Sequence, residues 1–177
     1  MRQCQARPAQ VETMNDKRGA APRSFEDIVD QLKPLLHKLQ RGPAYHGLTL
    51  RKLPKEGVYV FYENGKPMYV GRVGSKSKQT VRQRIRQHTI PSSGHNQATF
   101  AFRLLQEGLG LSAGHESDMT RPELAEKYEA KFSEQKRRVR NMEVRAVEVT
   151  DSMVQAVFEV YAALTLGTTR YNHFDTH

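Results

Sequence analysis

Two tyrosines in a short β-type segment are the first residues of this chain whose types and spacing could do chemistry. Tyr59 lies in an apolar run over residues 57–62, and Tyr69 lies in a second run over residues 68–71. Asn64-Gly65 stands between the two runs and predicts a two-residue hairpin turn. Because both tyrosines lie at similar distances from this turn, they are expected to approach each other on one face of the hairpin.

Cations near the hairpin could activate one of these tyrosines. A tyrosine hydroxyl ionises at about pH 10 in water, and adjacent positive charge lowers that pKa. Arg72 and Arg84 are the nearby candidates. A phenolate flanked by them could accept a proton from water attacking a phosphate. The alternative is that Tyr59 and Tyr69 are ordinary strand residues whose hydroxyls face solvent.

A single carboxylate stands out in the last apolar segment. Glu159 is the only charged residue between Ser152 and Leu166. It either belongs to an exposed stripe with Gln155, one helical turn earlier, or it faces a site. Held near a phosphate, one carboxylate suffices for Mg²⁺ or Mn²⁺, because substrate and water supply the other oxygens.

Positive charge is concentrated in two segments. The chain has 28 Lys and Arg against 19 Asp and Glu, a formal charge of +9, and these two segments account for all of it. Local positive charge is what neutralising the phosphates of nucleic acid requires, and a solvated helix face is the alternative. The first segment contains Arg72, Lys76, Lys78, Arg82, Arg84 and Arg86; the second contains Lys136, Arg137, Arg138, Arg140 and Arg145, offset by Glu143.

Two triplets on the hairpin resemble a known family. Gly57-Val58-Tyr59 followed by Tyr69-Val70-Gly71 is similar to the paired signature of the GIY-YIG nucleases. The resemblance covers about residues 57–89 and 141–174. The other family positions match residues that occur in the same order and on the same kinds of element: Arg84, His88, Glu159 and Asn172.

Three features depart from the family pattern. The loop from Gly71 to Arg84 is longer than in compact members, and Arg72 stands where Lys is common. Residues 91–140 form an inserted helical region that the minimal family module lacks. None of these departures removes an expected catalytic residue.

The resemblance implies metal-dependent hydrolysis of phosphodiester bonds. Glu159 would hold one Mg²⁺, and Tyr59 would take the proton of the attacking water, with Tyr69 as the orienting partner or the alternative base. Arg84, assisted by Arg72, would stabilise the charge of the transition state. The other matching residues have supporting roles: His88 would orient the base or bind phosphate, and Asn172 would position the tyrosine or the glutamate.

The predicted function is therefore a GIY-YIG-type DNA endonuclease. Its phosphate-binding residues would be Lys76, Lys78, Arg82, Arg86, Arg137, Arg138 and Arg140. The alternatives are a catalytically silent nucleic-acid-binding module and an RNA-cleaving nuclease. The same residues could act on DNA or RNA, because direct attack by water needs no 2′-hydroxyl.

Helices and strands that could hold these residues are indicated along most of the chain. Ser24 caps a helix with apolar residues at helical spacing, in which Pro34 predicts a kink or a break. Gly167 is expected to end the last helix, and Asp151 or Ser152 to begin it. Between the hairpin and that helix, the pattern predicts helices over Thr80–His88, Gln97–Gln106 and Pro122–Arg140 and a strand over Asn141–Thr150.

These elements predict an α+β fold with a small, about three-stranded, mixed or antiparallel sheet flanked by helices. The expected organisation is a disordered tail over residues 1–23, a helical extension over 24–42 and the GIY-YIG-like nuclease domain over 43–177. The inserted helical region would occupy about 91–140.

Composition excludes several classes of protein. Apolar residues make up 37% of the chain, and no run approaches the ~18 residues that a membrane span needs. The single cysteine, Cys4, allows no disulfide within one chain, which favours a cytoplasmic, intracellular setting. No small-molecule cofactor is expected. The sequence is compatible with either a monomer or a homodimer.

Overall fold

A computed structural model describes residues 24–74, 76–111, 119–172 and 174. The predicted tail over residues 1–23 lies outside them. None of the described helices is long and apolar enough to cross a membrane. In chain order the elements are α1 (Phe25–Arg41), a 3₁₀ helix η1 (Gly47–Lys52), β1 (Gly57–Glu63), β2 (Lys66–Val73), α2 (Val81–Thr89), α3 (Thr99–Gly108), α4 (Arg121–Lys127), α5 (Glu129–Arg140), β3 (Glu143–Val147) and α6 (Ser152–Thr165).

The sheet has three antiparallel strands in the order β2-β1-β3. The predicted hairpin is confirmed: Asn64 and Gly65 both have positive φ, 52° and 77°, as the favoured two-residue turn requires. Gly71 pairs with Tyr59, and Tyr69 pairs with Phe61. Because side chains alternate along a strand, both tyrosines point to the same face of the sheet.

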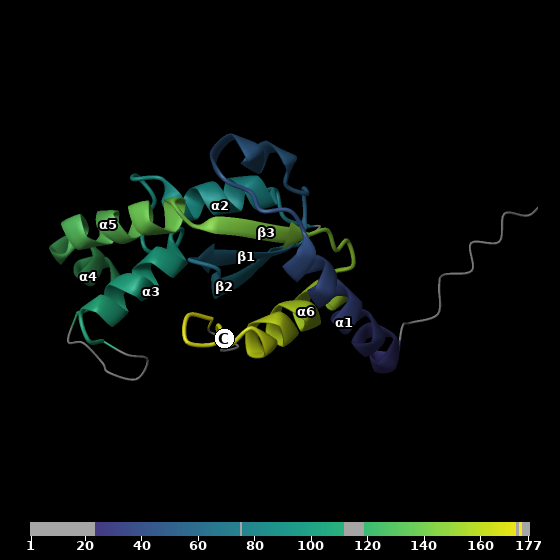
Figure 1. The fold of residues 1–177 in the computed structure, drawn as a ribbon. Coiled ribbons are helices and arrows are strands. Elements are labelled where there is room, and N and C mark those ends of the chain that lie inside the picture. The colour runs from purple at the N-terminus through teal and green to yellow at the C-terminus, as the bar shows by residue number, and fades with distance from the viewer. Residues whose placement is uncertain (1–23, 75, 112–118, 173, 175–177) are drawn as a thin grey trace, which may run out of the picture.

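Helices cover both faces of this sheet, which confirms the predicted α+β class (Figure 1). On one face, α1 and α6 pack against alternate residues of β1 and β2, among them Val58, Val60 and Val70. On the other face, α2 and the inserted helices pack around Tyr59 and Phe61. The residues predicted as a helical extension thus form α1, which contributes buried leucines to the first of these two cores.

Two helices in the structure differ from the helices that the sequence predicts. No break occurs at Pro34, because the buried side chains of Leu32 and Leu36 hold α1 against the core on both sides of it. The helix predicted over 122–140 is two helices, α4 and α5, since Tyr128 leaves helical geometry between them with φ −113° and ψ 34°. The 3₁₀ helix η1 was not predicted. The loop predicted after Gly108 lies largely outside the described residues.

Candidate active site

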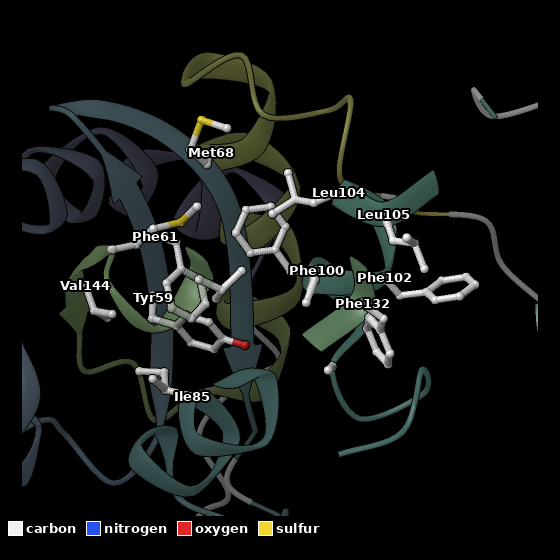
Figure 2. Packing of buried hydrophobic residues seen from close by; sticks show 14 of the residues in the cluster. Tyr59, Phe61, Met68, Ile85, Phe100, Phe102, Leu104, Leu105, Phe132 and Val144 are labelled. Atoms are coloured by element: carbon white, nitrogen blue, oxygen red, sulfur yellow. The ribbon is translucent and has the colours of Figure 1, made fainter. Parts of the chain in front are cut away.

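The side chain of Tyr59 crosses the neighbouring strand over Gly71. Figure 2 shows its ring extending from β1 toward β2, with the hydroxyl at the far end. A Cβ atom placed on Gly71 would lie 2.5 Å from both Cζ and Oη of Tyr59. Any side chain at position 71 would therefore displace this ring, so the glycine of the second triplet creates the space that Tyr59 occupies.

His88 is the hydrogen-bond partner of Tyr59. The Tyr59 hydroxyl lies 3.0 Å from Nε2 of His88, and both side chains are buried. Burial and the positive charge of Arg84 lower the pKa of His88 well below its ordinary value, so the ring is neutral at pH 7. Its Nδ1 atom has no partner among the described residues. The pair is thus a phenol beside a neutral imidazole, enclosed by the rings of Phe61 and Tyr69.

The expectation that nearby cations lower the pKa of the tyrosines is wrong for this structure. Burial raises the pKa of Tyr59 well above 10, Tyr69 adds to the rise, and Arg84 only partly opposes it. Burial likewise raises the pKa of Tyr69, with Arg84 opposing. Both hydroxyls therefore keep their protons at neutral pH. Removal of bulk water costs a phenolate more than one neighbouring guanidinium restores.

Arg84 is held in place by the inserted region. Its guanidinium donates hydrogen bonds to the backbone carbonyl of Gln97 (3.0 Å) and to the hydroxyl of Thr99 (3.3 Å), at the start of α3. A third hydrogen bond reaches the side chain of Gln87, 3.2 Å away. Nothing in the sequence pattern marked Gln97 or Thr99 as partners, because the loop before α3 brings them to α2 only in the folded chain.

Glu159 faces the hairpin and not an exposed stripe. Its carboxylate accepts a hydrogen bond of 2.8 Å from Nε of Arg72, and its side chain is 20% exposed. Gln155, the other member of the supposed stripe, is fully buried. Burial raises the pKa of Glu159, while Arg72 and then Arg84 oppose the rise. The charge of Glu159 in turn raises the pKa of both Tyr59 and Tyr69, which places all of these groups in one electrostatic site.

Asn172 supports this site through the backbone of β2. Its Oδ1 accepts from the N–H of Val70 at 3.1 Å, and its Nδ2 donates to the carbonyl of the same residue at 2.6 Å. Val70 belongs to β2, which is an edge strand of the sheet. Asn172 therefore forms hydrogen bonds with an N–H and a carbonyl that no neighbouring strand could reach. The predicted hydrogen bond to a tyrosine or to the glutamate is replaced by this contact, one residue from Tyr69.

The basic residues predicted to bind phosphate fall into different settings. Lys76, Lys78 and Arg137 are exposed. Arg138 is committed to Glu63, with two hydrogen bonds of 2.7 Å each, so its charge is already paired. Arg82, Arg86 and Arg140 line a cavity on another side of α2.

Two other cations of the second basic segment serve the fold. Lys136 is buried and donates to the backbone carbonyls of Pro91 and Ser93. Arg145 pairs with Glu143 at 2.6 Å. The second segment therefore leaves fewer cations free to meet a phosphate than its sequence predicts.

The residues present would fit a hard divalent cation held by one carboxylate. Among the described residues, no group of three or more His, Cys, Asp and Glu could hold a metal ion. This excludes a zinc-type cage built from them, which needs several nitrogen or sulfur ligands. Mg²⁺ differs, because it keeps several waters and takes further oxygens from a phosphate. Glu159 is the carboxylate that could provide the protein ligand.

Comparison of the chain with protein-family models, with curated proteins and with solved structures finds no match. The resemblance to the GIY-YIG nucleases therefore depends on the residues named above. The support that the structure adds is geometric: motif residues from β1, β2, α2 and α6 lie around one site.

Proposed function

We propose that this chain is a Mg²⁺-dependent endonuclease that hydrolyses phosphodiester bonds of DNA, with Mn²⁺ as an alternative ion. The observation that carries the proposal is the convergence of Tyr59, His88, Arg84 and Glu159, which are up to 100 positions apart in the sequence. A fold has no evident structural need to gather a buried phenol and a buried imidazole with a half-buried guanidinium and a half-buried carboxylate. Such perturbed groups in one place are typical of active sites.

Tyr59 and His88 would move the proton of the attacking water. Because the Tyr59 hydroxyl is protonated, it acts as a relay and not as a preformed phenolate. In the tautomer with hydrogen on Nδ1, Nε2 of His88 accepts the phenolic proton at 3.0 Å while Tyr59 takes a proton from water. The low pKa of His88 keeps this acceptor free at neutral pH. Tyr69 would orient the water or replace Tyr59 as the base.

The two arginines would stabilise negative charge on the scissile phosphate. Arg84 is preorganised by its hydrogen bonds to Gln97 and Thr99, so it loses little entropy in meeting the transition state. Arg72 is exposed enough to contact DNA and is oriented by Glu159. A guanidinium suits this task because its planar fork matches two phosphate oxygens.

Glu159 would supply the single protein ligand of the divalent cation. When bound, such an ion supplies Lewis-acid stabilisation of the phosphate and of the leaving oxygen. Arg72 fixes the direction of the carboxylate from one side by donating to Oε2.

A cleavage panel tests the proposal. The substrates are supercoiled plasmid, linear duplex, single-stranded and branched DNA, and RNA, each with Mg²⁺, with Mn²⁺ and with chelator. We expect metal-dependent cuts in DNA that leave 5′-phosphate and 3′-hydroxyl ends. Binding without cleavage on every substrate would identify a silent nucleic-acid-binding module, and cleavage of RNA alone would identify a ribonuclease.

A further inference from the structure

A cavity of about 670 Å³ lies on another side of α2 from the Tyr59–His88 pair. It is bounded by α2, by residues 45–50 and by residues 139–144 at the junction of α5 and β3. Its size falls within the range of pockets that hold small molecules, about 300–1,000 Å³. Phe61 and Ile85 line it and also pack in the core beside Tyr59, as Figure 2 shows. The cavity and the candidate active site therefore have a common wall.

The helical repeat separates the arginines of α2 into two groups. Arg82, Arg86 and Thr89 are spaced by four and three residues, so they lie on one side of the helix and line the cavity. Arg84 and His88 are four residues apart and lie on the side of the candidate active site. Arg82 and Arg86 therefore do not belong to that site.

Positive charge at this cavity is unbalanced. Arg140, at the end of α5, joins Arg82 and Arg86 in the lining, and no acidic residue is among the described residues that line it. Within the described part of the chain, these three arginines form none of the observed ion pairs. The acids of the adjoining surface, Glu63 and Glu143, are held by Arg138 and Arg145.

The rest of the lining suits a flat apolar ring. Buried Phe61, Val139 and Val144 are among the residues that form its apolar part. Tyr45 and His46 add aromatic rings, and Asn141 adds an amide without a described partner that could bond to the edge of a base.

We propose that this cavity is a nucleotide-binding site. The base would enter the apolar part, and the phosphate would meet the guanidinium groups of Arg82, Arg86 and Arg140. The shared chemistry is a phosphate attached to a planar ring, which either a free mononucleotide or an unstacked nucleotide of a DNA strand presents. The site goes beyond the proposed cleavage centre and does not require cleavage.

Calorimetric titration with 2′-deoxyadenosine 5′-monophosphate tests this site. The buffer contains chelator, so failure of the metal-dependent activity cannot affect the result. Wild type should bind the nucleotide, and deoxyadenosine or inorganic phosphate should each bind more weakly. Arg82→Gln with Arg86→Gln should weaken binding by about tenfold or more, the loss expected for charge-assisted hydrogen bonds. Arg140→Gln, on a different element, should weaken it in the same direction.

A matched double variant distinguishes binding in the cavity from general attraction between a positively charged protein and a negatively charged nucleotide. Lys33→Gln with Lys38→Gln removes the same charge from the exposed side of α1, away from both sites, and should leave nucleotide affinity nearly unchanged. All altered side chains are exposed, so thermal melting should confirm that each variant folds. Equal losses in the two double variants, or no nucleotide binding by wild type, would overturn the proposal.

Single-stranded oligonucleotides then distinguish the two sources of the ligand. An oligonucleotide with one abasic position keeps every phosphate but lacks one base. If it binds about tenfold more weakly than the intact strand, and the Arg82/Arg86 variant removes this difference, the site takes a nucleotide of the strand. If the strands bind alike while the mononucleotide binds tightly, the site takes a free nucleotide.

Discussion

At the scale of single residues, the environment of each ionisable group defines its chemistry. Tyr59 is a protonated phenol because it is buried, and His88 is a neutral acceptor for the same reason. Arg84 is fixed by three hydrogen bonds, whereas Lys76 stands exposed in a loop. Substitutions at these positions should therefore have different kinetic consequences.

Glu159→Gln should abolish cleavage and leave DNA binding nearly intact. The amide keeps the size of the side chain and removes the charge that would hold the cation. Gel-shift affinity and plasmid cleavage with Mg²⁺ measure the two effects, with chelator-treated wild type as the control. Cleavage at a rate near wild type would show that Glu159 is not the metal ligand.

Tyr59→Phe should lower the rate by about 10²-fold or more, the usual effect of losing a general acid–base group. Tyr69→Phe is the matched control, because it removes the other tyrosine hydroxyl of the same face and should be less severe. Single-turnover rates at saturating DNA compare them. The opposite order would reassign the roles, and equal mild losses would mean that both tyrosines only pack or position.

Arg84→Ala and Lys76→Ala should fail in different ways. Loss of Lys76 should weaken binding and reduce the slope of log affinity against log salt by about one, as for one phosphate contact. Loss of Arg84 should change affinity little but lower the single-turnover rate by about 10²–10³-fold, which is typical of one preorganised donor. Arg84→Lys should restore little, because an ammonium cannot make the two-pronged contact.

Binding isotherms and rates for these three variants decide the role of Arg84. If Arg84→Ala matches Lys76→Ala in both measurements, Arg84 contributes only to the general positive field.

At the scale of elements, the site depends on how the unpaired backbone groups of the edge strand β2 find hydrogen-bond partners. Asn172 bonds to both backbone groups of Val70, and Thr168 donates to the Oδ1 of Asn172 at 3.0 Å. The segment after α6 thereby replaces a fourth strand at this point. The inserted region has a comparable role on the other side, because the start of α3 anchors Arg84.

Asn172→Ala should destabilise the protein by about 1–3 kcal/mol, because the N–H and carbonyl of Val70 lose their partners. Thr169→Ala, an exposed change three residues earlier, is the control. Urea denaturation measures the free energy of unfolding. In the variant, the amide hydrogen of Val70 should exchange with solvent faster than in wild type. An unchanged exchange rate at Val70 would contradict this role.

At the scale of the whole molecule, burial of polar groups makes stability depend on pH. His88 binds a proton less readily in the folded chain than in the unfolded chain. The contribution of His88 to the free energy of unfolding is therefore complete above its unfolded pKa of about 6.5. This contribution is lost as the pH falls below that value. One such proton changes the free energy of unfolding by about 1.4 kcal/mol per pH unit in that window.

His88→Gln should reduce this pH dependence. Urea denaturation at pH 7.5, 6.5 and 5.5 should give a steeper loss of stability for wild type than for the variant. His37→Gln removes an exposed histidine and should retain the wild-type slope. Identical slopes for wild type and His88→Gln would show that another group is responsible.

Local signals in the sequence determined most of the elements, and the family resemblance supplied the set of candidate catalytic residues. Asn64-Gly65 specified the hairpin turn, and Ser24, Thr80 and Asp151 specified helix starts, because each acts through backbone groups within a few residues. The face that Tyr69 occupies was not determined in this way. Regular pairing across the two-residue turn would place Tyr69 opposite Val60 and so on the other face from Tyr59, whereas the bulge between Phe61 and Tyr62 shifts the register by one residue and brings both tyrosines to one face.

Only the tertiary structure decided what each charged or polar group contacts. Burial of Gln155 beside Glu159, the pairing of Arg138 with Glu63, and the rise rather than the fall in the tyrosine pKa values all depend on segments far apart in the sequence. Desolvation and partner distance are set when such segments pack, so no local pattern carries them. The cavity beside Arg82 and Arg86 has the same origin, because α2, residues 45–50 and residues 139–144 meet only in the folded chain.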